Sequence, residues 1–275
     1  MTDLVVDGNS LFARSWFAAE KQTPDEPAEV VKLVVRTILK LLHPGSDLRV
    51  HFNRTFFAWD SEQAKSKNRK PKPPEYHATR LVLKEVLSLM LGTVHHEHPD
   101  HEGDDIVATV VYQSKSDDTV YVVSGDKDLQ QFQGRNCQIY CLNAKAVLNP
   151  AYIVSRFHVK RPNQIAIALA IKGDAVDNIS GIRGWGEAKV KKLFEQVPKT
   201  AKFDEALRII EENIPEHLKH DFYSSLERTL LGKTVPDVPS PAPIVVGDPE
   251  QVASLEIPDI GFLYQQVYDA YRVRD

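Results

Sequence analysis

Acidic side chains stand where predicted strands end. Three apolar, β-branched-rich runs, residues 4–6, 55–59 and 119–123, are typical of buried strands because each stops at a turn signal. The acids that follow them are Asp7, Asp60, Asp126 and Asp128. A further group, Glu102, Asp104 and Asp105, opens a predicted helix in HEGDDIVAT. Ligands bind beyond the carboxyl ends of parallel strands, so these acids are expected to converge on one spot.

Clustered carboxylates repel one another unless cations neutralise them. A purely oxygen ligand set suits Mg²⁺, or Mn²⁺ in its place, better than zinc. Two such ions about 4 Å apart can activate water and stabilise a leaving oxygen in phosphodiester hydrolysis. Each acid alone has a plainer interpretation, as a turn former or as a partner of a helix dipole. Their joint placement favours a metal centre.

A second region, KGDAVDNISGIRGWGEAKVKKLFE, combines glycine turns with a basic helix. Gly181, Gly184 and Gly186 permit tight turns, and Lys189, Lys191 and Lys192 follow directly. Amide groups at such a helix start can bind phosphate without reading base sequence. An ordinary helix–turn–helix connection with a solvated lysine face explains the spacing equally well. A second basic stretch, residues 65–72, carries five cations and no acid.

The elements that position these residues alternate between strand and helix through the first part of the chain. This alternation predicts a three-layer α/β fold with a mostly parallel central sheet. We expect an α/β catalytic domain over residues 1–160, with a basic loop at 61–74. A helical subdomain is expected over 161–235 and a proline-rich tail, packed on the body, over 236–275.

At these motifs the sequence resembles the 5′-nuclease family of flap endonucleases, bacteriophage 5′-exonucleases and the 5′-nuclease domain of bacterial DNA polymerase I. The matching segments are VDGNSLFAR, AWD, EGDDIVAT, VVSGDKDLQQF and GDAVDNISGIRGWGEAKVKKL. The resemblance implies that the acids named above hold or neighbour two Mg²⁺ ions, with Asp174 and Asp177 completing the second ion's surroundings. It also implies a helix–three-turn–helix at 173–197 that grips duplex DNA and can bind K⁺.

The same resemblance places the basic loop over the active site. Lys67 would contact the scissile phosphate with Lys70 as its partner, although Lys65 or Arg69 fits the pattern too. The predicted catalytic residues are therefore Lys67, Lys70 and Asp126, and Lys65 and Arg69 join the predicted DNA contacts. Trp16 and Trp59 are expected in the core, and a packing role is favoured for Trp185.

The implied activity is structure-dependent cleavage of DNA, as a 5′-flap endonuclease and 5′-to-3′ exonuclease in replication or repair. Its partners would be DNA with 5′ ends, flaps or nicks and also RNA–DNA hybrids, and the protein would act as a monomer. Two alternatives remain open: a PIN-like ribonuclease and a non-catalytic protein that binds DNA junctions. A zinc site at His95, His96, His98 and His101 is conceivable, although no thiolate joins them.

Bulk composition sets the remaining limits. The net charge of −4 argues only weakly against a nucleic-acid partner, because ions at an acidic site would offset part of it. Cys137 and Cys141 do not form a disulfide framework, which fits a reducing cytoplasm, that of the bacterial host if the source is a phage. No apolar run reaches the roughly 20 residues of a membrane helix.

Overall fold

The computed structural model describes residues 1–20, 27–43, 46, 48–61, 72–134, 136–232 and 234–247. The chain divides into two compact units. Unit 1 holds Met1–Gly125, Tyr140–Ala146 and the chain from Thr234, whereas unit 2 holds Asp126–Ile139 and Val147–Lys233. Residues 126–139 and 147–160 therefore belong to unit 2.

The sheet is mostly parallel. Its order is β3-β2-β1-β4-β5-β6, and β7 pairs with β2. The bounds are β1 (Thr2–Asp7), β2 (Arg54–Asp60), β3 (Val94–His98), β4 (Thr119–Ser124), β5 (Cys137–Cys141), β6 (Ala146–Val147) and β7 (Ala242–Pro243). β1 runs parallel to β2 and β4, β2 runs parallel to β3, and β7 is antiparallel to β2. The predicted α/β class is confirmed.

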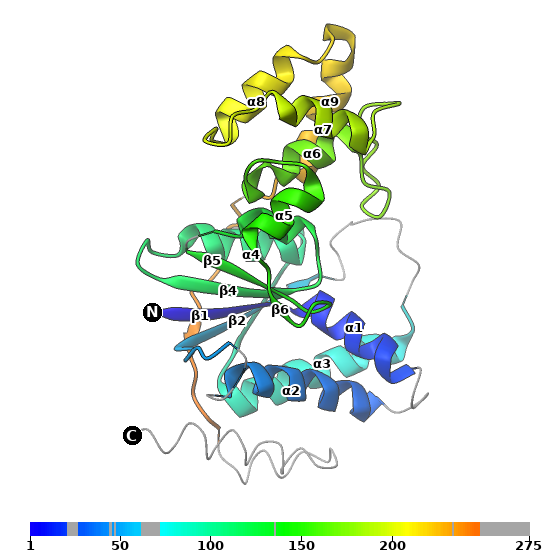
Figure 1. Ribbon diagram of the computed structural model, residues 1–275. Coiled ribbons are helices and arrows are strands. Elements are labelled where there is room, and N and C mark those ends of the chain that lie inside the picture. Colours follow the sequence, from blue (N-terminus) through cyan, green and yellow to red (C-terminus); the bar gives the residue numbers. More distant parts are fainter. Residues whose placement is uncertain are drawn as a thin grey trace. The chain divides into compact units, whose positions relative to one another are not determined.

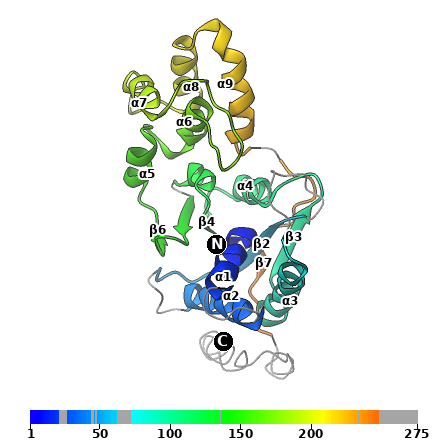
Figure 2. The same cartoon turned by 90° about the vertical axis from the view of Figure 1, so that its right-hand side faces the viewer.

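Helices cover both faces of the sheet of unit 1 (Figure 1). They are α1 (Gly8–Glu20), α2 (Pro27–Leu42), α3 (Pro74–Leu91) and α4 (Gly103–Gln113). Figures 1 and 2 both show α1, α2 and α3 together on one side of the strands, with α4 on the other. Alternation along the strands explains the layers, since Leu4 and Val6 join the α1–α3 core whereas Val5 does not.

The core near the strand ends also positions Asp7. Trp59 is 1% exposed, which confirms its predicted place in the core, and Trp16 is partly buried against that core. A Cβ atom on Gly8 would lie 2.6 Å from atoms of the Trp59 ring. Glycine at this position therefore allows α1 to begin immediately after Asp7, directly over the indole.

Unit 2 consists of short helices around a buried one. They are η1 (Asp128–Phe132), α5 (Pro150–Phe157), η2 (Pro162–Gln164), α6 (Ile165–Lys172), α7 (Glu187–Glu195), α8 (Phe203–Glu212) and α9 (Glu216–Thr229). Residues 165–171 of α6 are all buried, as expected for a helix that is apolar all round. The Thr229 hydroxyl of α9 donates to the Ala166 carbonyl at 2.9 Å.

The described part of the proline-rich tail, residues 236–247, belongs to unit 1. Beyond β7, the Val245 N–H donates to the Leu91 carbonyl at 3.1 Å, and the Gly247 N–H donates to the Met90 carbonyl at 3.0 Å. Among the described residues, no helix combines the length and apolar character that crossing a membrane would require.

Candidate metal centre

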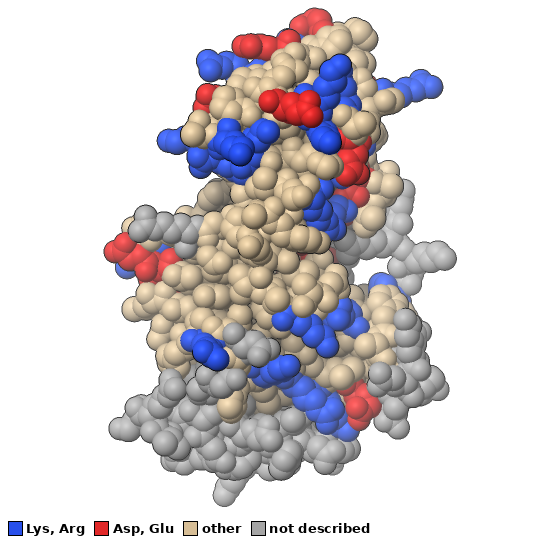
Figure 3. Space-filling model, in the orientation of Figure 1, with Lys and Arg blue, Asp and Glu red and all other residues tan. Residues whose placement is uncertain are grey.

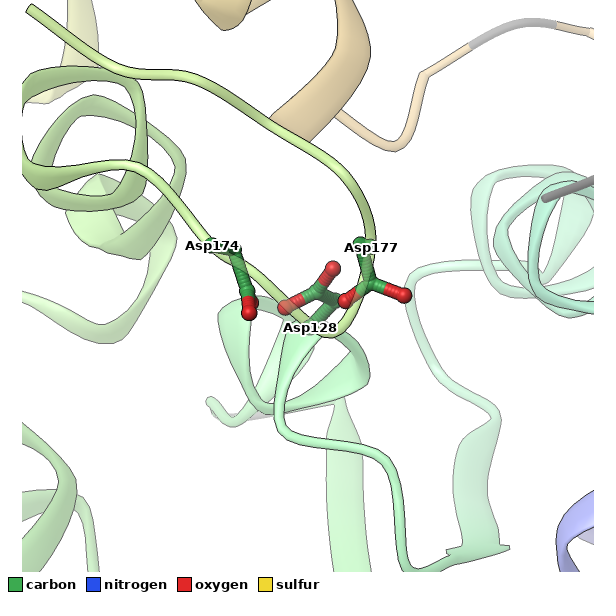
Figure 4. A group of neighbouring side chains, drawn as sticks. All are labelled: Asp128, Asp174 and Asp177. Carbon is green, nitrogen blue, oxygen red and sulfur yellow. The ribbon is translucent and has the colours of Figure 1, made fainter. Parts of the chain in front are cut away.

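Three aspartates of unit 2 bring their side chains together. Oxygen atoms of Asp128, Asp174 and Asp177 lie within 4.8 Å of one another, and all three residues are buried. Asp128 begins η1, while the other two lie on the loop after α6, and the three side chains face one another (Figure 4). In the part of the chain that the structure describes, no other set of three His, Cys, Asp or Glu side chains meets this spacing.

Backbone hydrogen bonds hold the loop that carries two of these acids. The Asp174 N–H donates to the Ile179 carbonyl at 2.8 Å, and the Ile179 N–H donates back to the Asp174 carbonyl at 2.7 Å. Asp174 Oδ1 also accepts the Val176 N–H at 3.1 Å. The loop is therefore a closed turn that fixes the spacing of Asp174 and Asp177.

Two glycines make this turn possible. Gly173 and Gly181 have φ of 77° and 64°, a region that side chains disfavour. A Cβ on Gly181 would lie 2.2 Å from the Gly173 nitrogen, so the two chain segments cross without room for a side chain. The predicted role of Gly181 in close backbone approach thus has a structural basis, and the approach is to the chain itself.

The electrostatics of the cluster favour a bound cation. Burial, together with the charges of Asp126 and Asp177, raises the pKa of Asp128 to about 7. Asp128 is 6% exposed, and its buried Oδ1 has no hydrogen-bond partner. Buried carboxylate oxygens without donors are costly unless a cation compensates them. An oxygen-only set of this kind fits a hard divalent ion.

Lys127 supplies positive charge to the cluster. Its Nζ atom pairs with Asp174 and lies 3.7 Å from Asp177 Oδ2. Burial alone would lower its pKa, but the bond to Asp174 and the surrounding carboxylates raise the pKa above its usual value. Sequence reasoning missed this residue, although the alternating Asp126-Lys127-Asp128 run was a visible signal.

Arg228 of α9 anchors the loop from outside the cluster. Its Nη1 donates to the Asn178 carbonyl at 2.8 Å, and its Nη2 donates to the Asp177 carbonyl at 3.1 Å. Asn178 has a φ of 54°, so the anchored residue adopts a left-handed conformation. No sequence signal connects α9 with this loop, because the two are distant in the chain.

The predicted acids of unit 1 lie at the carboxyl edge of the sheet. Asp7 Oδ1 accepts the Ser10 N–H at 3.0 Å, and Asp7 Oδ2 accepts the Ser124 hydroxyl at 2.6 Å. Asp60 Oδ1 accepts the Gly103 N–H at 2.7 Å, which joins the end of β2 to the start of α4. These hydrogen bonds hold both carboxylates in place at neighbouring strand ends.

The acids at the start of α4 make contacts different from those of Asp7 and Asp60. Glu102 is the N-cap residue, although its side chain makes no capping hydrogen bond. Asp104 Oδ1 accepts the Asp105 N–H at 3.0 Å, and Asp105 Oδ2 lies 3.8 Å from His101 Nδ1. In unit 2, Asp126 Oδ1 accepts the Asp128 N–H at 2.9 Å, which places Asp126 directly beside the cluster.

The predicted cations divide into two groups. Lys65, Lys67, Arg69 and Lys70 lie outside the described residues. In α7, Lys191 and Lys192 are exposed, whereas Lys189 Nζ lies 4.2 Å from the Trp185 ring centroid. Gly184 has a φ of 80°, and Gly186 is the N-cap of α7. On the face shown in Figure 3, Lys and Arg side chains gather in several groups over the helices of unit 2.

The histidines do not assemble a zinc site within the described ranges. His95 accepts the Trp59 indole N–H at 3.0 Å, and its Nε2 lies 2.8 Å from the Thr93 hydroxyl. Burial, with Lys84 nearby, lowers the pKa of His95 to about 4. The ring centroids of His98 and His101 lie 4.8 Å apart, but these side chains belong to no set of three close ligand atoms among the described residues. His95 is therefore a half-buried histidine whose ring is hydrogen-bonded to Trp59 and Thr93, and its lowered pKa favours the neutral form.

Comparisons with known proteins show a family match and several relatives. Residues 2–158 match the family described as 5′-3′ exonuclease, N-terminal resolvase-like domain. The thermostable DNA polymerase I of Thermus thermophilus is 27% identical over 250 residues, which are 88% of this chain and 29% of that protein. The 5′-3′ exonuclease of Mycoplasmopsis pulmonis is 28% identical over 211 residues, 74% of this chain and 69% of that protein. The chain thus spans less than a third of the polymerase relative.

Solved structures share the fold. The bacteriophage T5 D15 protein, co-crystallised with metal ions, aligns over 98% of this chain and 99% of its own, with a TM-score of 0.63 and 14% identity. The catalytic core of Rad2 in complex with a DNA substrate aligns over 98% and 90%, with a TM-score of 0.60 and 14% identity. With the family match covering more than half of its residues, this chain belongs to the 5′-3′ exonuclease family.

Proposed function

We propose that this protein is a metal-dependent, structure-specific 5′-nuclease that hydrolyses phosphodiester bonds in DNA. The observation that carries the proposal is the buried carboxylate cluster of Asp128, Asp174 and Asp177, with an Asp128 oxygen that lacks a donor. The family to which the chain belongs supports the same reaction class. DNA with 5′ ends, flaps or nicks is the proposed substrate, with RNA–DNA hybrids as a further one.

The proposed ion is Mg²⁺, replaceable by Mn²⁺, and two ions are proposed. The three clustered aspartates, together with Asp126, would hold one ion. We assign the other to the strand-end and α4 acids Asp7, Asp60, Glu102, Asp104 and Asp105. Such ions supply Lewis-acid activation of water and stabilisation of the leaving oxygen.

The chain's own residues hold the ligands and the substrate in this proposal. The Ser124 hydroxyl and the Ser10 N–H orient the Asp7 carboxylate, and the Gly103 N–H orients the Asp60 carboxylate. The turn with Gly181, Gly184 and Gly186, followed by Lys189, Lys191 and Lys192, would grip a duplex backbone, and its carbonyls would accept K⁺. Lys67 would stabilise negative charge on the scissile phosphate, with Lys70 beside it.

The decisive experiment is cleavage-product mapping on a labelled 5′-flap, a nicked duplex and an RNA–DNA hybrid, with Mg²⁺ or with EDTA. We expect Mg²⁺-dependent products with 5′-phosphate and 3′-hydroxyl ends, which Asp126→Ala abolishes. The exposed Asp117→Asn serves as the matched acidic control. Activity that survives Asp126→Ala would show that the site is assigned wrongly.

The same assay separates the two alternatives. Cleavage of single-stranded RNA that is indifferent to Lys189→Ala and Lys191→Ala would favour a PIN-like ribonuclease. Flap binding without any cleavage, in Mg²⁺ or Mn²⁺, would favour a non-catalytic junction-binding protein. Loss of duplex-DNA cleavage in the lysine variants is the result expected here.

A further inference from the structure

The acidic cluster of unit 2 is built from two separate segments. Asp128 begins η1, whereas Asp174 and Asp177 lie on the loop after α6 (Figure 4). The hydrogen bonds of the closed turn fix the spacing within the loop. Mg²⁺ demands a near-octahedral set of oxygen ligands at short distances, so its affinity also depends on the spacing between the two segments. Carboxylates that repel one another would widen this spacing unless other contacts hold it.

Gln131 fastens the first segment to the end of α9. Its side chain is buried, and Nε2 donates to the Asp128 carbonyl at 2.8 Å and to the Thr229 carbonyl at 3.4 Å. Its Oε1 accepts the Leu231 N–H at 3.3 Å. The reverse orientation of the amide would set its oxygen against two carbonyls, so the orientation is fixed. One side chain thus joins the start of η1 to the last residue of α9 and to the chain just after it.

The same end of α9 fastens the second segment. Arg228 donates to the Asn178 carbonyl at 2.8 Å and to the Asp177 carbonyl at 3.1 Å. The neighbouring residue, Thr229, is 1% exposed, and its hydroxyl donates to the Ala166 carbonyl of α6 at 2.9 Å. The end of α9 is therefore anchored to the buried helix that leads into the acidic loop.

Residues 228–231 contact both segments within one short length of chain. Consecutive Cα atoms are about 3.8 Å apart, so the two points of attachment cannot separate far. The Leu230 N–H also donates to the Leu226 carbonyl at 2.9 Å, which closes the last turn of α9. A displacement of one segment would therefore strain the contacts that hold the other.

We propose that Gln131 and Arg228 position Asp128 and Asp177 for a divalent ion by fastening both segments to the same end of α9. Both are positioning residues, because they act through the backbone of the acids. Contacts behind metal ligands commonly contribute to metal affinity, and ligands held before binding lose less conformational entropy. The proposal rests on the metal-dependent function proposed above and deepens it.

The first test is calorimetric titration of the DNA-free protein with Mg²⁺. Gln131→Met keeps the length of the side chain but removes its N–H donors and its carbonyl acceptor. The charge of the protein does not change, so the long-range attraction of the cluster for Mg²⁺ stays the same. We expect Mg²⁺ to bind about tenfold more weakly. An affinity equal to that of the wild type would overturn the proposal.

Gln164→Met is the matched control for the loss of buried hydrogen bonds. Gln164 is 0% exposed, and its Nε2 donates to the Ala201 carbonyl at 3.0 Å. Its Oε1 accepts the N–H groups of Lys160 and Arg161 at 3.0 and 3.1 Å, and none of these partners belongs to the cluster. Both variants should melt at a lower temperature in EDTA, but only Gln131→Met should bind Mg²⁺ more weakly. Equal weakening in both would overturn the proposal.

Arg228→Lys tests the second link without a change of charge. Lysine lacks the planar fork that reaches two carbonyls at once. Because Arg228 is exposed, water replaces part of the lost contact, and we expect Mg²⁺ binding to weaken only roughly threefold. A surface substitution of this kind keeps the proposal testable even if Gln131→Met does not fold. Arg208→Lys, at an exposed arginine of α8, is the control; the same affinity in both variants would overturn the role of Arg228.

The double variant of Gln131→Met with Arg228→Lys tests whether the two links act together. If both hold the same distance, loss of one leaves less for the other to maintain. Mg²⁺ binding in the double variant should then weaken by clearly less than the roughly thirtyfold product of the single losses. A loss equal to that product would mean that the two links are independent and would overturn the shared anchor.

Single-turnover cleavage of a 5′-flap at increasing Mg²⁺ concentration gives a second measure. Gln131→Met should need a higher Mg²⁺ concentration for half of its maximal rate, whereas Gln164→Met should follow the wild-type curve. Excess Mg²⁺ should restore most of the rate of Gln131→Met, because the ligands themselves are intact. A loss of rate that is the same at every Mg²⁺ concentration would contradict a role in positioning the metal ligands.

The two proposals fail in different ways. If flaps are cleaved but neither Gln131→Met nor Arg228→Lys alters Mg²⁺ affinity, the function stands and the positioning role falls. If both variants weaken Mg²⁺ binding while no protein cleaves any substrate, the positioning role stands and the nuclease function falls. Absence of Mg²⁺ binding by the wild type would overturn the positioning role.

Discussion

Buried carboxylates in the two units differ in the hydrogen-bond donors and cations around them. In unit 1, the fully buried Asp3 accepts two hydrogen bonds of 2.7 Å from the Arg54 guanidinium. In unit 2, the buried Asp128 has an oxygen without any donor, and two more aspartates lie beside it. Unit 1 therefore supplies the countercharge for Asp3 from its own side chains, whereas Lys127 offsets only part of the charge of the unit 2 cluster.

This difference distinguishes structural acids from functional ones better than burial does. A buried ion pair with complete hydrogen bonds needs nothing further, and it contributes to the folded state as a unit. A cluster with too few cations is unfavourable by itself and becomes favourable when a ligand supplies charge. Proteins retain such local instability where function requires it.

The largest effect is expected on catalysis. Asp128→Asn should reduce single-turnover cleavage of a 5′-flap about 1,000-fold, because a neutral amide replaces an anionic ligand and several kcal/mol of transition-state stabilisation are lost. Asp117→Asn, which changes an exposed acid, should remain active. If Asp128→Asn cleaves at the wild-type rate, the buried acids of unit 2 are no more functional than those of unit 1.

The next effect is on the stability of unit 1. Asp3→Asn should lower the free energy of unfolding by about 3 kcal/mol, because it leaves the Arg54 guanidinium without its bidentate partner. Urea unfolding measures this change. Cleavage per folded molecule should stay at the wild-type level, and a selective loss of cleavage would mean that Asp3 is more than structural.

The metal-free cluster should respond to pH in an unusual direction. The folded pKa of Asp128 is raised to about 7, so the folded state binds its proton more tightly than the unfolded chain does. In EDTA, stability attributable to this group is present below about pH 4 and is lost as the pH rises to 7, by about 2–4 kcal/mol. Asp128→Asn should therefore be more stable than wild type in EDTA at pH 8.

That comparison is made by thermal unfolding at pH 4 and pH 8, with Mg²⁺ as a further arm. The higher stability of Asp128→Asn should vanish at pH 4. At pH 8, Mg²⁺ should raise the stability of the wild type, because ion binding stabilises the folded state. If Asp128→Asn is less stable than wild type in EDTA at pH 8, the interpretation that the negative charge of the cluster lacks enough cations is wrong.

In unit 1 the pH response should be the opposite. The pKa of His95 is lowered to about 4, so the unfolded chain takes up its proton first as the pH falls. Stability from this group is complete above about pH 6.5 and is lost toward pH 4, by roughly 2–3 kcal/mol. His95→Gln should make the free energy of unfolding less dependent on pH between 4 and 6.5, as measured by urea unfolding. If the variant and the wild type depend on pH identically, His95 is not the cause of the loss of stability.

The smallest effect concerns the lysine within the cluster. Lys127→Met should lower the melting temperature in EDTA, since the carboxylates lose a paired cation. It should also tighten Mg²⁺ binding by a few-fold, roughly threefold to tenfold, because an internal competitor is removed. Calorimetric titration of DNA-free protein checks this, with Lys115→Met as an exposed control. Weaker Mg²⁺ binding would show that Lys127 assists the ion.

Much of the fold was accessible from the sequence, for reasons that are local. Apolar runs such as residues 119–123, together with the alternation of strand and helix, predicted a mostly parallel α/β sheet correctly. The boundaries of the two units were less accessible. The stretch after Gly125 belongs to unit 2 because of the segments that it packs against in space, and no change in composition marks where that stretch begins.

The candidate site was only partly accessible. Asp128, Asp174 and Asp177 were all predicted as metal ligands, and their proximity is now observed. The expectation of one acidic centre did not distinguish them from Asp7 or Asp60, whose oxygens accept hydrogen bonds from Ser124 and from the Gly103 N–H. The donors that hydrogen-bond to a carboxylate come from residues that are its neighbours in space. The spacing of acids along the chain therefore could not show which of them lack donors.

The sequence by itself determined the element types, the acids at strand ends and the glycines at the turn, because side-chain period and backbone freedom are local properties. Only the tertiary structure decided which carboxylates meet, that Lys127 pairs with them and that Arg228 holds their loop from α9. These relations arise when distant segments are buried together, where desolvation makes every missing partner costly.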